Sequence, residues 1–400
     1  YAFIPSSLML GVTSFITTDI AAVPLMWIIP FVLYLLTYIA AFAKRDVIPH
    51  RVYVWLLPVL LVPMILFFNQ SLDISAWIIM PYHLVTFFVI ARTYHGEMAN
   101  SAPATSHLTE FYFWLSLGGA LGGVFNALVA PVVFDRLLEY PLVLMLAGLA
   151  LPAATMKKLD LKLVPSIYSA LFGLAVTATV AFFATGETFD VYFYGTLIVY
   201  GCIVYSVVIS SRWPRIFGVM FVIAGIIALV MSFRGEEEIY VERSFFGANS
   251  VVEWGELRVM YNGVIKHGAQ ITEEGYQDQA MTYYSKGSPI HQAFQAVNEA
   301  DSPPPVAAIG LGVGTVATHA AEGQQLDFLE IDPVVVGIAR DYFTYLDRCG
   351  DRCRVVIGDG RLELLEADAA SYDTIVLDAY SSDAIPVHLI TREAIEVYRS

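Results

Sequence analysis

The pattern of hydrophobic and polar positions changes once along the chain, near residue 235. Before that point, long apolar runs follow one another with short polar interruptions. A helix that crosses a bilayer needs about 20 mostly apolar residues, and a helix satisfies its own backbone groups in lipid. The pattern therefore predicts a membrane bundle of about eight helices, with residues 1–20 as a further span or a re-entrant segment. The predicted spans are residues 24–43, 52–68, 76–91, 111–134, 141–155, 164–183, 191–210 and 216–233.

Small and polar residues inside these spans suggest how the bundle packs. Gly118, Gly119, Gly122 and Gly123 form two overlapping G-x-x-x-G pairs, which predict close approach of a second helix. Ionisable groups at membrane depth are costly and are functional candidates by default. A shared polar cavity is one interpretation of these groups, and positions at the membrane interface are the other. The polar candidates are Asp19, His83, His95, Glu97, His107, Glu110 and Asn126.

After residue 235 the periodicity is that of a water-exposed domain. Short β-rich runs lie at residues 239–247 and 257–261, and Asn262-Gly263 after the second run indicates a hairpin. From residue 306 onward, short apolar strands alternate with helical segments, which is typical of a parallel α/β sheet. The expected strands are residues 306–309, 328–332, 354–357 and 374–377.

The predicted fold class is thus a multi-span α-helical membrane bundle, then a small β platform, then an α/β Rossmann-like domain of the class I S-adenosylmethionine type. The expected domains are residues 1–235, the platform with its linking helix at 236–300, and the cofactor domain at 301–400. The chain starts at Tyr1 without Met and stops at Ser400 within the α/β pattern. We therefore expect a fragment that is truncated at both ends.

Composition and charge agree with this division. The chain is 57% hydrophobic and 15% charged, far from the soluble average. Residues 1–235 carry 11 Lys/Arg and 10 Asp/Glu, whereas residues 236–400 carry 11 and 27. An acidic domain of this kind disfavours nucleic acid as a partner, because phosphate contacts need Lys and Arg. It either attracts a cationic substrate or is simply a solvated surface.

The three cysteines predict no metal site. Cys202 lies in an apolar run and is interpreted as a small core residue. Cys349 and Cys353 are four residues apart, with too few Cys or His residues nearby to complete a zinc site.

Acidic and glycine residues gather where the predicted parallel strands end. Ligands of open α/β sheets bind outside the carboxyl ends of the strands. Gly310, Gly312 and Gly314 follow the first strand and allow a ligand to approach the backbone closely. Glu330 ends the second strand, and Asp359 with Gly360 and then Asp378 follow the third and fourth. This arrangement predicts an adenosine-containing ligand, and the alternative is a domain that kept the fold and lost the ligand.

NAD is a less favoured ligand on the same residues. Thr315 stands where the final glycine of G-x-G-x-x-G is expected. The Gly358-Asp359-Gly360 turn is better suited to an S-adenosyl ligand.

Three motifs carry a resemblance to a known family. Residues 261–265 with Gln270 are similar to an apolar-Asp-Gly-x-x-Gln hairpin, and residues 281–284 lie where that family has a Tyr-Gln pair. The run from Tyr372 to Pro386 is similar to Tyr-Asp-x-Ile-x-x-Asp-Ser-Ser-Asp-x-x-x-Pro. From about residue 236 onward the chain resembles spermidine synthases, the polyamine aminopropyltransferases. As a whole it resembles bacterial proteins in which a multi-span membrane region is fused to such a domain.

The resemblance implies a role for each matching residue. Decarboxylated S-adenosylmethionine, or S-adenosylmethionine itself, is the implied co-substrate, with no metal. Glu330 is expected to hold its ribose, and Asp359 with Gly360 to meet its adenine. Asp378 is the implied proton acceptor, and a small cationic amine is the implied acceptor substrate. The implied amine-binding residues are Asp383, Tyr283 and Tyr284, and the implied cofactor site consists of Gln270, Gly310, Gly312, Gly314, Glu330, Asp359 and Gly360.

Two positions depart from the family. Val313 replaces the acid that contacts the amino-bearing tail of the co-substrate, and Tyr284 replaces the Gln of the Tyr-Gln pair. The leading expectation is a membrane-bound aminopropyltransferase acting on an amine such as putrescine, with a homodimer as a candidate assembly. Two alternatives stay open: an S-adenosylmethionine-dependent methyltransferase, and a transporter or sensor whose domain binds a polyamine or nucleoside without chemistry.

Loop charge and cofactor chemistry predict opposite orientations in the membrane. Basic residues follow the spans at 24–43, 141–155 and 191–210, which by the positive-inside rule makes that face cytoplasmic. The domain after residue 235 would then emerge on the opposite side. A cytosolic co-substrate requires the reverse. We expect an integral membrane protein, in a bacterial inner membrane, with its C-terminal domain in the cytoplasm and membrane lipid as a partner.

Overall fold

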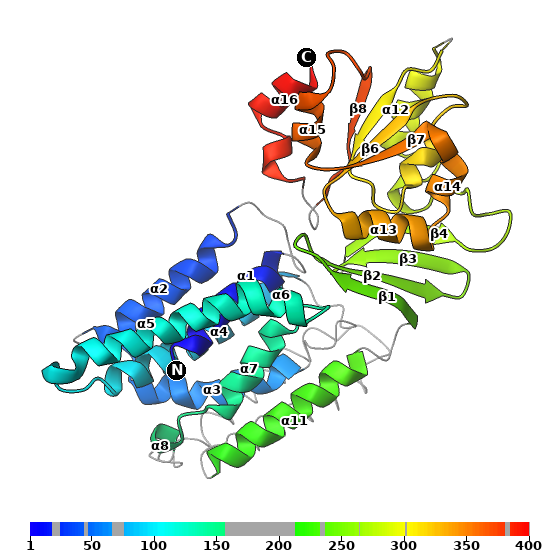
Figure 1. Ribbon diagram of the computed structural model, residues 1–400. Helices are drawn as coiled ribbons and strands as arrows, with labels where there is room; N and C mark the ends of the chain where they lie inside the picture. The colour runs from blue at the N-terminus through cyan, green and yellow to red at the C-terminus, as the bar shows by residue number, and fades with distance from the viewer. Residues whose placement is uncertain are drawn as a thin grey trace. The chain divides into compact units, whose positions relative to one another are not determined.

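The computed structural model describes residues 1–17, 25–43, 47–65, 76–156, 213–232, 237–263, 265–300, 302–380 and 385–399 (Figure 1). The chain divides into two compact units. The first comprises Tyr1–Thr13, Trp27–Val129 and Leu138–Arg234, and the second comprises Ser14–Met26, Ala130–Leu137 and Gly235–Ser400.

The first unit is helical in all of its long described segments. Its helices are α1 (Phe3–Phe15), α2 (Ile28–Phe42), α3 (His50–Met64), α4 (Ala76–Asn100), α5 (Leu108–Val124), α7 (Glu139–Leu149), α8 (Ala153–Met156) and α11 (Pro214–Ser232). The helix α5 runs on through a π-helical turn (Phe125–Val129) into α6 (Ala130–Val133), which belongs to the second unit. The predicted spans at 164–183 and 191–210 lie outside the described residues.

Two helix boundaries differ from the sequence prediction. The helix α4 continues nine residues past the expected end at residue 91, because its polar residues point into the bundle: Arg92, Thr93 and His95 are buried. The expected helix at 141–155 is broken between α7 and α8 near Pro152, whose ring cannot continue a helix.

One helical stretch among the described residues is long and apolar enough to cross a membrane, namely Thr105–Val133. Five further apolar helices have 10–17 residues and fall short of that length. Most of the eight predicted spans are therefore helical where described, but a multi-span membrane bundle stays a prediction.

The glycine pairs of α5 pack as expected, though only on one side. A Cβ on Gly122 would lie 2.6 Å from the carbonyl oxygen of Phe3, and one on Gly118 would lie 3.1 Å from Cβ of Ala2. A Cβ on Gly119 or on Gly123 would have no neighbouring heavy atom within 4 Å. Close approach of α1 therefore depends on Gly118 and Gly122.

The polar residues of the first unit have separate partners. His83 hydrogen-bonds to the Tyr140 hydroxyl at 2.8 Å, and His95 to the Thr37 hydroxyl at 3.1 Å. Glu97 accepts a hydrogen bond from Thr155 at 2.8 Å and pairs with His50 at 2.7 Å. Asp19 lies outside the described residues. His83, His95 and Glu97 of α4 therefore each have a partner on another helix or turn of the first unit.

The second unit begins with an antiparallel sheet in the order β1-β2-β3-β4. Its strands are β1 (Glu237–Arg243), β2 (Ala248–Trp254), β3 (Leu257–Asn262) and β4 (Ile265–Ile271). The expected hairpin at Asn262-Gly263 is confirmed, and Gly263 has the positive φ of +58° that such a turn needs. The predicted run at residues 239–247 combined β1 with the turn that follows it. The sequence pattern did not predict β2 as a separate strand, and in β2 the polar Asn249 is buried.

A parallel sheet in the order β7-β6-β5-β8 follows. The strands β5 (Val306–Ile309), β6 (Leu326–Glu330), β7 (Cys353–Ile357) and β8 (Thr374–Leu377) confirm the four strands predicted from sequence to within two residues at each end. The helices around it are α12 (Pro289–Asn298), α13 (Pro333–Tyr342), α14 (Tyr345–Cys349), α15 (Gly360–Glu366) and α16 (Arg392–Tyr398).

The helix expected directly after the Gly-rich turn is only a short 3-10 helix, Thr315–His319. Thr315, Val316 and Thr318 are β-branched and lose side-chain freedom in a helix, and Gly323 follows soon after with a φ of +80°. The chain therefore turns back to β6 after one short helical segment.

Cys349 and Cys353 are joined by a disulfide that closes the turn between α14 and β7. Sequence spacing had argued only against a metal site at these residues. In the described part of the chain no group of three or more His, Cys, Asp or Glu side chains is placed to hold a metal ion.

Candidate functional site

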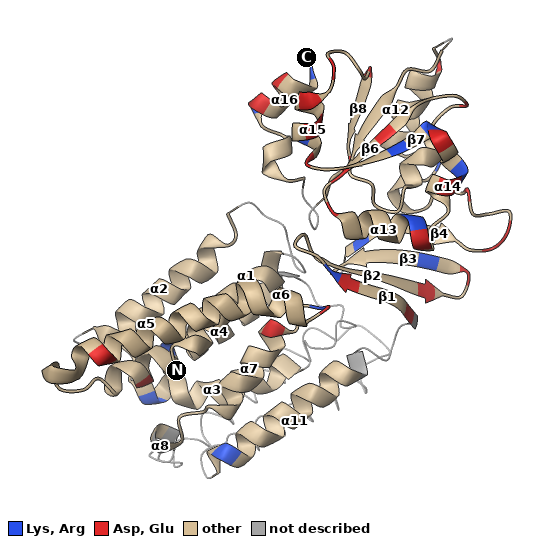
Figure 2. Ribbon diagram, viewed as in Figure 1, with Lys and Arg blue, Asp and Glu red and all other residues tan. Residues whose placement is uncertain are grey.

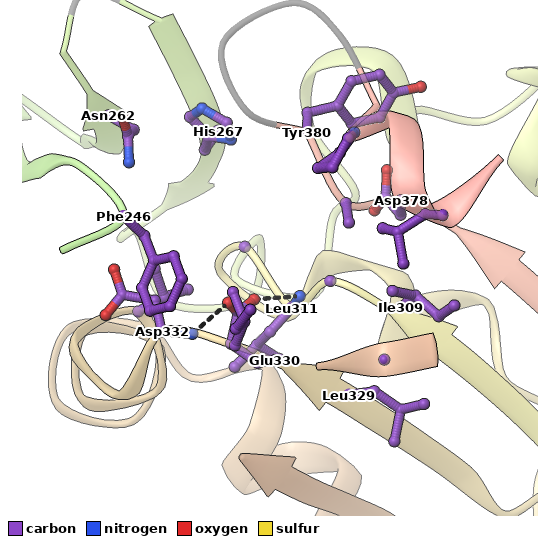
Figure 3. Close-up of a pocket in the computed structure, with 18 of the residues that line it drawn as sticks. Phe246, Asn262, His267, Ile309, Leu311, Leu329, Glu330, Asp332, Asp378 and Tyr380 are labelled. Carbon is purple, nitrogen blue, oxygen red and sulfur yellow. Dashed lines mark hydrogen bonds between the residues drawn. The ribbon is translucent and has the colours of Figure 1, made fainter. Parts of the chain in front are cut away.

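The carboxyl ends of the parallel strands open into a cavity of about 420 Å³ (Figure 3). The chain passes from β5 outward to β6 and β7 and then returns to β8 on the other side of β5. This reversal is the switch point where open α/β sheets bind ligands. Glu330, Asp359 and Asp378, which end or follow three different strands, all line this one cavity.

The Gly-rich turn after β5 passes too close to its neighbours for any side chain. A Cβ on Gly310, whose φ is +101°, would lie 2.6 Å from the carbonyl oxygen of Asp378. A Cβ on Gly312, whose φ is +53°, would lie 3.0 Å from the carbonyl oxygen of His267 in β4. The two glycines thus bring the turn against β8 and against the antiparallel sheet, and both line the cavity.

Glu330 connects the tip of β6 to this turn. Its carboxylate accepts hydrogen bonds from the backbone N–H of Leu311 and of Asp332, each at 2.9 Å (Figure 3). Burial raises the pKa of the Glu330 carboxyl, and these backbone hydrogen bonds oppose that rise. A carboxylate has four lone-pair sites in all, so Glu330 can accept a further hydrogen bond from a ligand in the cavity that it lines.

Asp378, directly after β8, is a second carboxyl group of the cavity with a raised pKa. The Tyr284 hydroxyl donates to Oδ2 of Asp378 at 2.7 Å. Burial raises the pKa of Asp378 to about 6, although the Tyr284 hydrogen bond favours the ionised form. Burial beside this carboxylate also holds the pKa of Tyr284 well above its usual value, so Tyr284 acts as a donor. Asp378 is therefore a carboxyl group that can exchange a proton near neutral pH.

Two aromatic rings stand beside Asp378. The rings of Tyr283 and Tyr284 lie 4.4 Å apart between centroids, and both side chains line the cavity. Tyr284 is buried, while Tyr283 is 48% exposed. Aromatic faces next to a carboxylate form a suitable environment for a cationic amine.

The antiparallel sheet supplies the opposite wall, which patterning did not find. Asn262 and His267 face the cavity from β3 and β4, and Phe246 faces it from the turn after β1 (Figure 3). Asn249 of β2 donates to Asp332 at 3.2 Å and accepts from Asn262 at 3.0 Å. In the sequence, only Asp332, an acidic residue two positions after Glu330, pointed to this wall. Its position in the sequence did not predict that Asn249 of β2 would be its partner.

Three predicted site residues are placed differently from the rest. Gln270 is buried in a network with Thr344, donating to its hydroxyl at 2.8 Å and accepting from its N–H at 3.1 Å, and it does not line the cavity. Gly314 caps the short 3-10 helix and also does not line it. Asp383 lies outside the described residues. The predicted residues that the cavity brings together are Tyr283, Tyr284, Gly310, Gly312, Glu330, Asp359, Gly360 and Asp378.

Val313 is a core residue. It is 1% exposed, and a Cβ on Gly268 of β4 would lie 2.4 Å from its Cγ2. It therefore faces the antiparallel sheet and does not line the cavity.

Comparison with known proteins shows a similarity to polyamine enzymes. The chain is 42% identical over 90 residues to a polyamine aminopropyltransferase of Vibrio vulnificus, and 41% identical over 64 residues to putrescine N-methyltransferase 3 of Nicotiana tabacum. These stretches cover 21% and 16% of this chain. The chain spans only 29% and 16% of the length of these two curated relatives. No protein-family model matches the chain.

Two solved structures are also similar. They are spermidine synthase from Thermotoga maritima, at 20% identity, and a spermidine synthase in complex with the transition state analogue AdoDATO, at 22% identity. Each covers 40% of this chain with a TM-score of 0.32, and the chain covers 52% and 53% of theirs. Likenesses with TM-scores this low do not bear on the function of the chain.

Proposed function

We propose that this chain is a membrane-bound aminopropyltransferase. It transfers an aminopropyl group from decarboxylated S-adenosylmethionine to an amine such as putrescine. The observation that carries the proposal is Asp378, a half-buried carboxyl group with a raised pKa of about 6, in one cavity with Glu330 and Asp359. The similarity to a polyamine aminopropyltransferase supports the same reaction class.

The reaction requires a proton acceptor at the amine. A primary ammonium has a pKa of about 10 and has no lone pair for attack until it loses a proton. Asp378 takes that proton, and burial of the ion pair favours the transfer. The amine lone pair then forms a bond to the methylene carbon next to sulfur. The carbon–sulfur bond breaks with its electron pair going to sulfur, which leaves a neutral thioether nucleoside.

The other carboxylates fit the nucleoside part of the donor. Glu330 lines the cavity at the tip of β6, and its carboxylate keeps acceptor capacity that suits the hydroxyl groups of a ribose. Asp359 and Gly360 lie after the next strand, where the base is expected. Holding donor and amine in line lowers the entropic part of the barrier, so positioning supplies most of the remaining catalysis.

The acceptor amine is expected between Asp378 and the two tyrosine rings. Tyr283 and Tyr284 offer π faces to the ammonium, and Asp378 offers its charge. We also propose that Asp383, from its place in the sequence motif, binds the distal ammonium of a diamine.

Product analysis tests this reaction. The purified chain is incubated with putrescine and decarboxylated S-adenosylmethionine, and separately with putrescine and S-adenosylmethionine. Mass spectrometry should find spermidine and methylthioadenosine in the first mixture and no N-methylputrescine in the second. Turnover of S-adenosylmethionine alone would contradict the proposal.

Val313 favours one second candidate, an S-adenosylmethionine-dependent methyltransferase. In the family that the chain resembles, an acid at this position contacts the amino-bearing tail of the donor. Here the position holds the buried Val313, which supplies no carboxylate to the described cavity. N-methylputrescine in the second mixture is the product that this candidate predicts. The similarity to a putrescine N-methyltransferase agrees with it.

The Tyr284 hydrogen bond sets a pH dependence that can be measured. Asp378 acts as a base only when ionised, so kcat/KM should fall as the pH drops through about 6. Removing the hydroxyl in Tyr284→Phe removes a bond that favours the carboxylate, so the acid limb should move up by about one pH unit. Tyr283→Phe is the matched control, because the Tyr283 hydroxyl contacts the Tyr284 hydroxyl, at a long 3.4 Å, and makes no hydrogen bond to Asp378. Its acid limb should stay in place. An unmoved limb in Tyr284→Phe contradicts this assignment.

We propose that the helical first unit lies in a membrane. Its helices carry few charged residues (Figure 2), and rows of large apolar side chains are exposed along α2 and α11. Exposed apolar rows of this length are typical of surfaces covered by lipid. The exposed residues are Ile29, Phe31, Val32, Leu35, Leu36 and Ile39 in α2, and Ile216, Val219, Met220, Ile223, Ile226, Ile227 and Val230 in α11.

The disulfide provides a test of the orientation. We propose that the α/β domain lies in the cytoplasm, where reducing conditions keep thiols free. The disulfide of the structure would then be the oxidised form of a pair that is reduced in intact cells. Cys349 and Cys353 should therefore react with an alkylating reagent after rapid acid quenching and denaturation. Cys202 serves as the internal thiol standard. A pair that stays oxidised in cells would place the domain on the other side of the membrane, as the positive-inside count of the loops predicts.

A further inference from the structure

Asp359 follows β7 and begins α15, and both oxygens of its carboxylate already have partners. Oδ1 accepts hydrogen bonds from the N–H of Arg361 at 3.0 Å and of Leu362 at 3.2 Å. Oδ2 lies 3.0 Å from Nε2 of His388. Because a carboxylate oxygen has two lone pairs, Oδ2 keeps one acceptor position besides the one that His388 fills. Asp359 and His388 both line the cavity, so a ligand there can reach that position.

His388 is held in place by its backbone. It lies in a 3-10 turn, Val387–Leu389, in which the carbonyl oxygens of His388 and Leu389 each accept a side-chain hydrogen bond. Arg361 donates to the carbonyl of His388 at 3.4 Å, and the Tyr398 hydroxyl donates to the carbonyl of Leu389 at 3.1 Å. The Leu389 side chain is buried, at 3% exposure, whereas the His388 side chain is 49% exposed. The turn is thus fixed while the imidazole reaches out to Asp359.

We propose that His388 is a positioning residue for recognition of the adenine base. Its Nε2–H donates to Oδ2 and, with the two backbone N–H groups on Oδ1, prevents the Asp359 carboxylate from rotating. The remaining lone pair of Oδ2 then accepts the 6-amino group of adenine. An ionised carboxylate can only accept hydrogen bonds, so a 6-oxo purine meets it with a second acceptor and is rejected. This inference rests on the proposed function, because it assumes an adenine-bearing donor.

Two nucleosides without a charged tail isolate this contact from the rest of the reaction. Methylthioadenosine and methylthioinosine differ at the 6-position of the purine, and each is titrated calorimetrically into the detergent-solubilised full chain. The unaltered chain should prefer methylthioadenosine by at least about tenfold, because a polar site rejects a ligand that leaves its groups unpaired. His388→Ala should weaken methylthioadenosine about tenfold, equivalent to about 1.4 kcal/mol, and leave methylthioinosine nearly unchanged.

The variant His388→Gln is the matched control. Its side-chain amide can donate to Oδ2 from a similar position, so the preference for the adenine nucleoside should return. A change that only loosened the fold would weaken both nucleosides equally and would not be reversed by glutamine. An equal loss for both nucleosides, or an unchanged ratio in His388→Ala, overturns the role of His388. An unaltered chain that binds neither nucleoside overturns the proposed donor and this inference with it.

Discussion

Replacing Asp378 with Asn should abolish transfer while it makes the protein more stable. An amide cannot take the proton of the attacking ammonium, and loss of a positioned general base lowers the rate by about 10² to 10⁴. The Tyr284 hydroxyl can still donate to the amide oxygen, so the cavity keeps its shape. Affinity for the nucleoside product should therefore change by less than about threefold, because the base is not part of ground-state binding.

The gain in stability follows from the raised pKa of Asp378, which burial shifts from 3.8 to about 6. The folded state then holds the proton more tightly than the unfolded state does. The stability that the folded state gains from binding this proton is fully present below pH 4 and is lost as the pH rises through 6. Above pH 6 the folded state therefore bears the cost of the desolvated carboxylate charge. Removing that cost should raise the free energy of unfolding by up to about 3 kcal/mol at pH 8.

Thermal unfolding of the detergent-solubilised chain at pH 8 and pH 5 measures this effect. The increase in Tm for Asp378→Asn should be larger at pH 8 than at pH 5, where more of the carboxyl group is already protonated. Asp347→Asn, in the short helix α14 and outside the cavity, is the control and should show no such difference. A variant that loses stability at pH 8, or that keeps its activity, contradicts the role given to Asp378.

Replacing Glu330 with Gln should have its largest effect on donor binding. The carboxylate accepts two backbone N–H groups, and the amide of glutamine turns an N–H donor toward one of them. The substitution also removes the charge that strengthens the hydrogen bonds from the ribose hydroxyls. Each charge-assisted bond contributes about 1.5–3 kcal/mol, so the dissociation constant for the donor should rise at least about 100-fold.

The control for this charge change is Glu366→Gln, at the exposed end of α15 and outside the cavity. Calorimetric titration with decarboxylated S-adenosylmethionine should give the same affinity for this control as for the unaltered chain. Donor affinity in Glu330→Gln within a few-fold of that value would mean that the ribose is held elsewhere.

The strand ends could be predicted because the information is local. Each parallel strand is a short, mostly apolar run, and Glu330, Asp359 and Asp378 come at its end or within two residues of it. Parallel strands bring such positions to one edge, so three acids far apart in sequence could be assigned to one cavity. The structure places all three there.

The partners of these acids could not be predicted, because they come from elements distant in sequence. The hydrogen bond from Tyr284 to Asp378 joins residues 94 apart, and Asn249 donates to Asp332 across 83 residues. The first depends on where the 3-10 turn Thr282–Tyr284 lies, and the second on how the antiparallel sheet packs against the parallel one. No periodicity in the sequence encodes either arrangement. Val313 and Gln270 show the converse. Both were aligned with positions of a sequence motif, yet each side chain packs inside the domain and outside the cavity.

The most direct test of the central claim is calorimetric binding of the donor by the full chain. The claim is that carboxylates at neighbouring strand ends surround a nucleoside-bearing sulfonium. Decarboxylated S-adenosylmethionine should bind the unaltered chain more tightly than S-adenosylmethionine does, and Glu330→Gln should lose that binding while Asp378→Asn keeps most of it. Two results would contradict the account. One is an unaltered chain that binds neither sulfonium, and the other is a Glu330→Gln variant that binds both as tightly as the unaltered chain does.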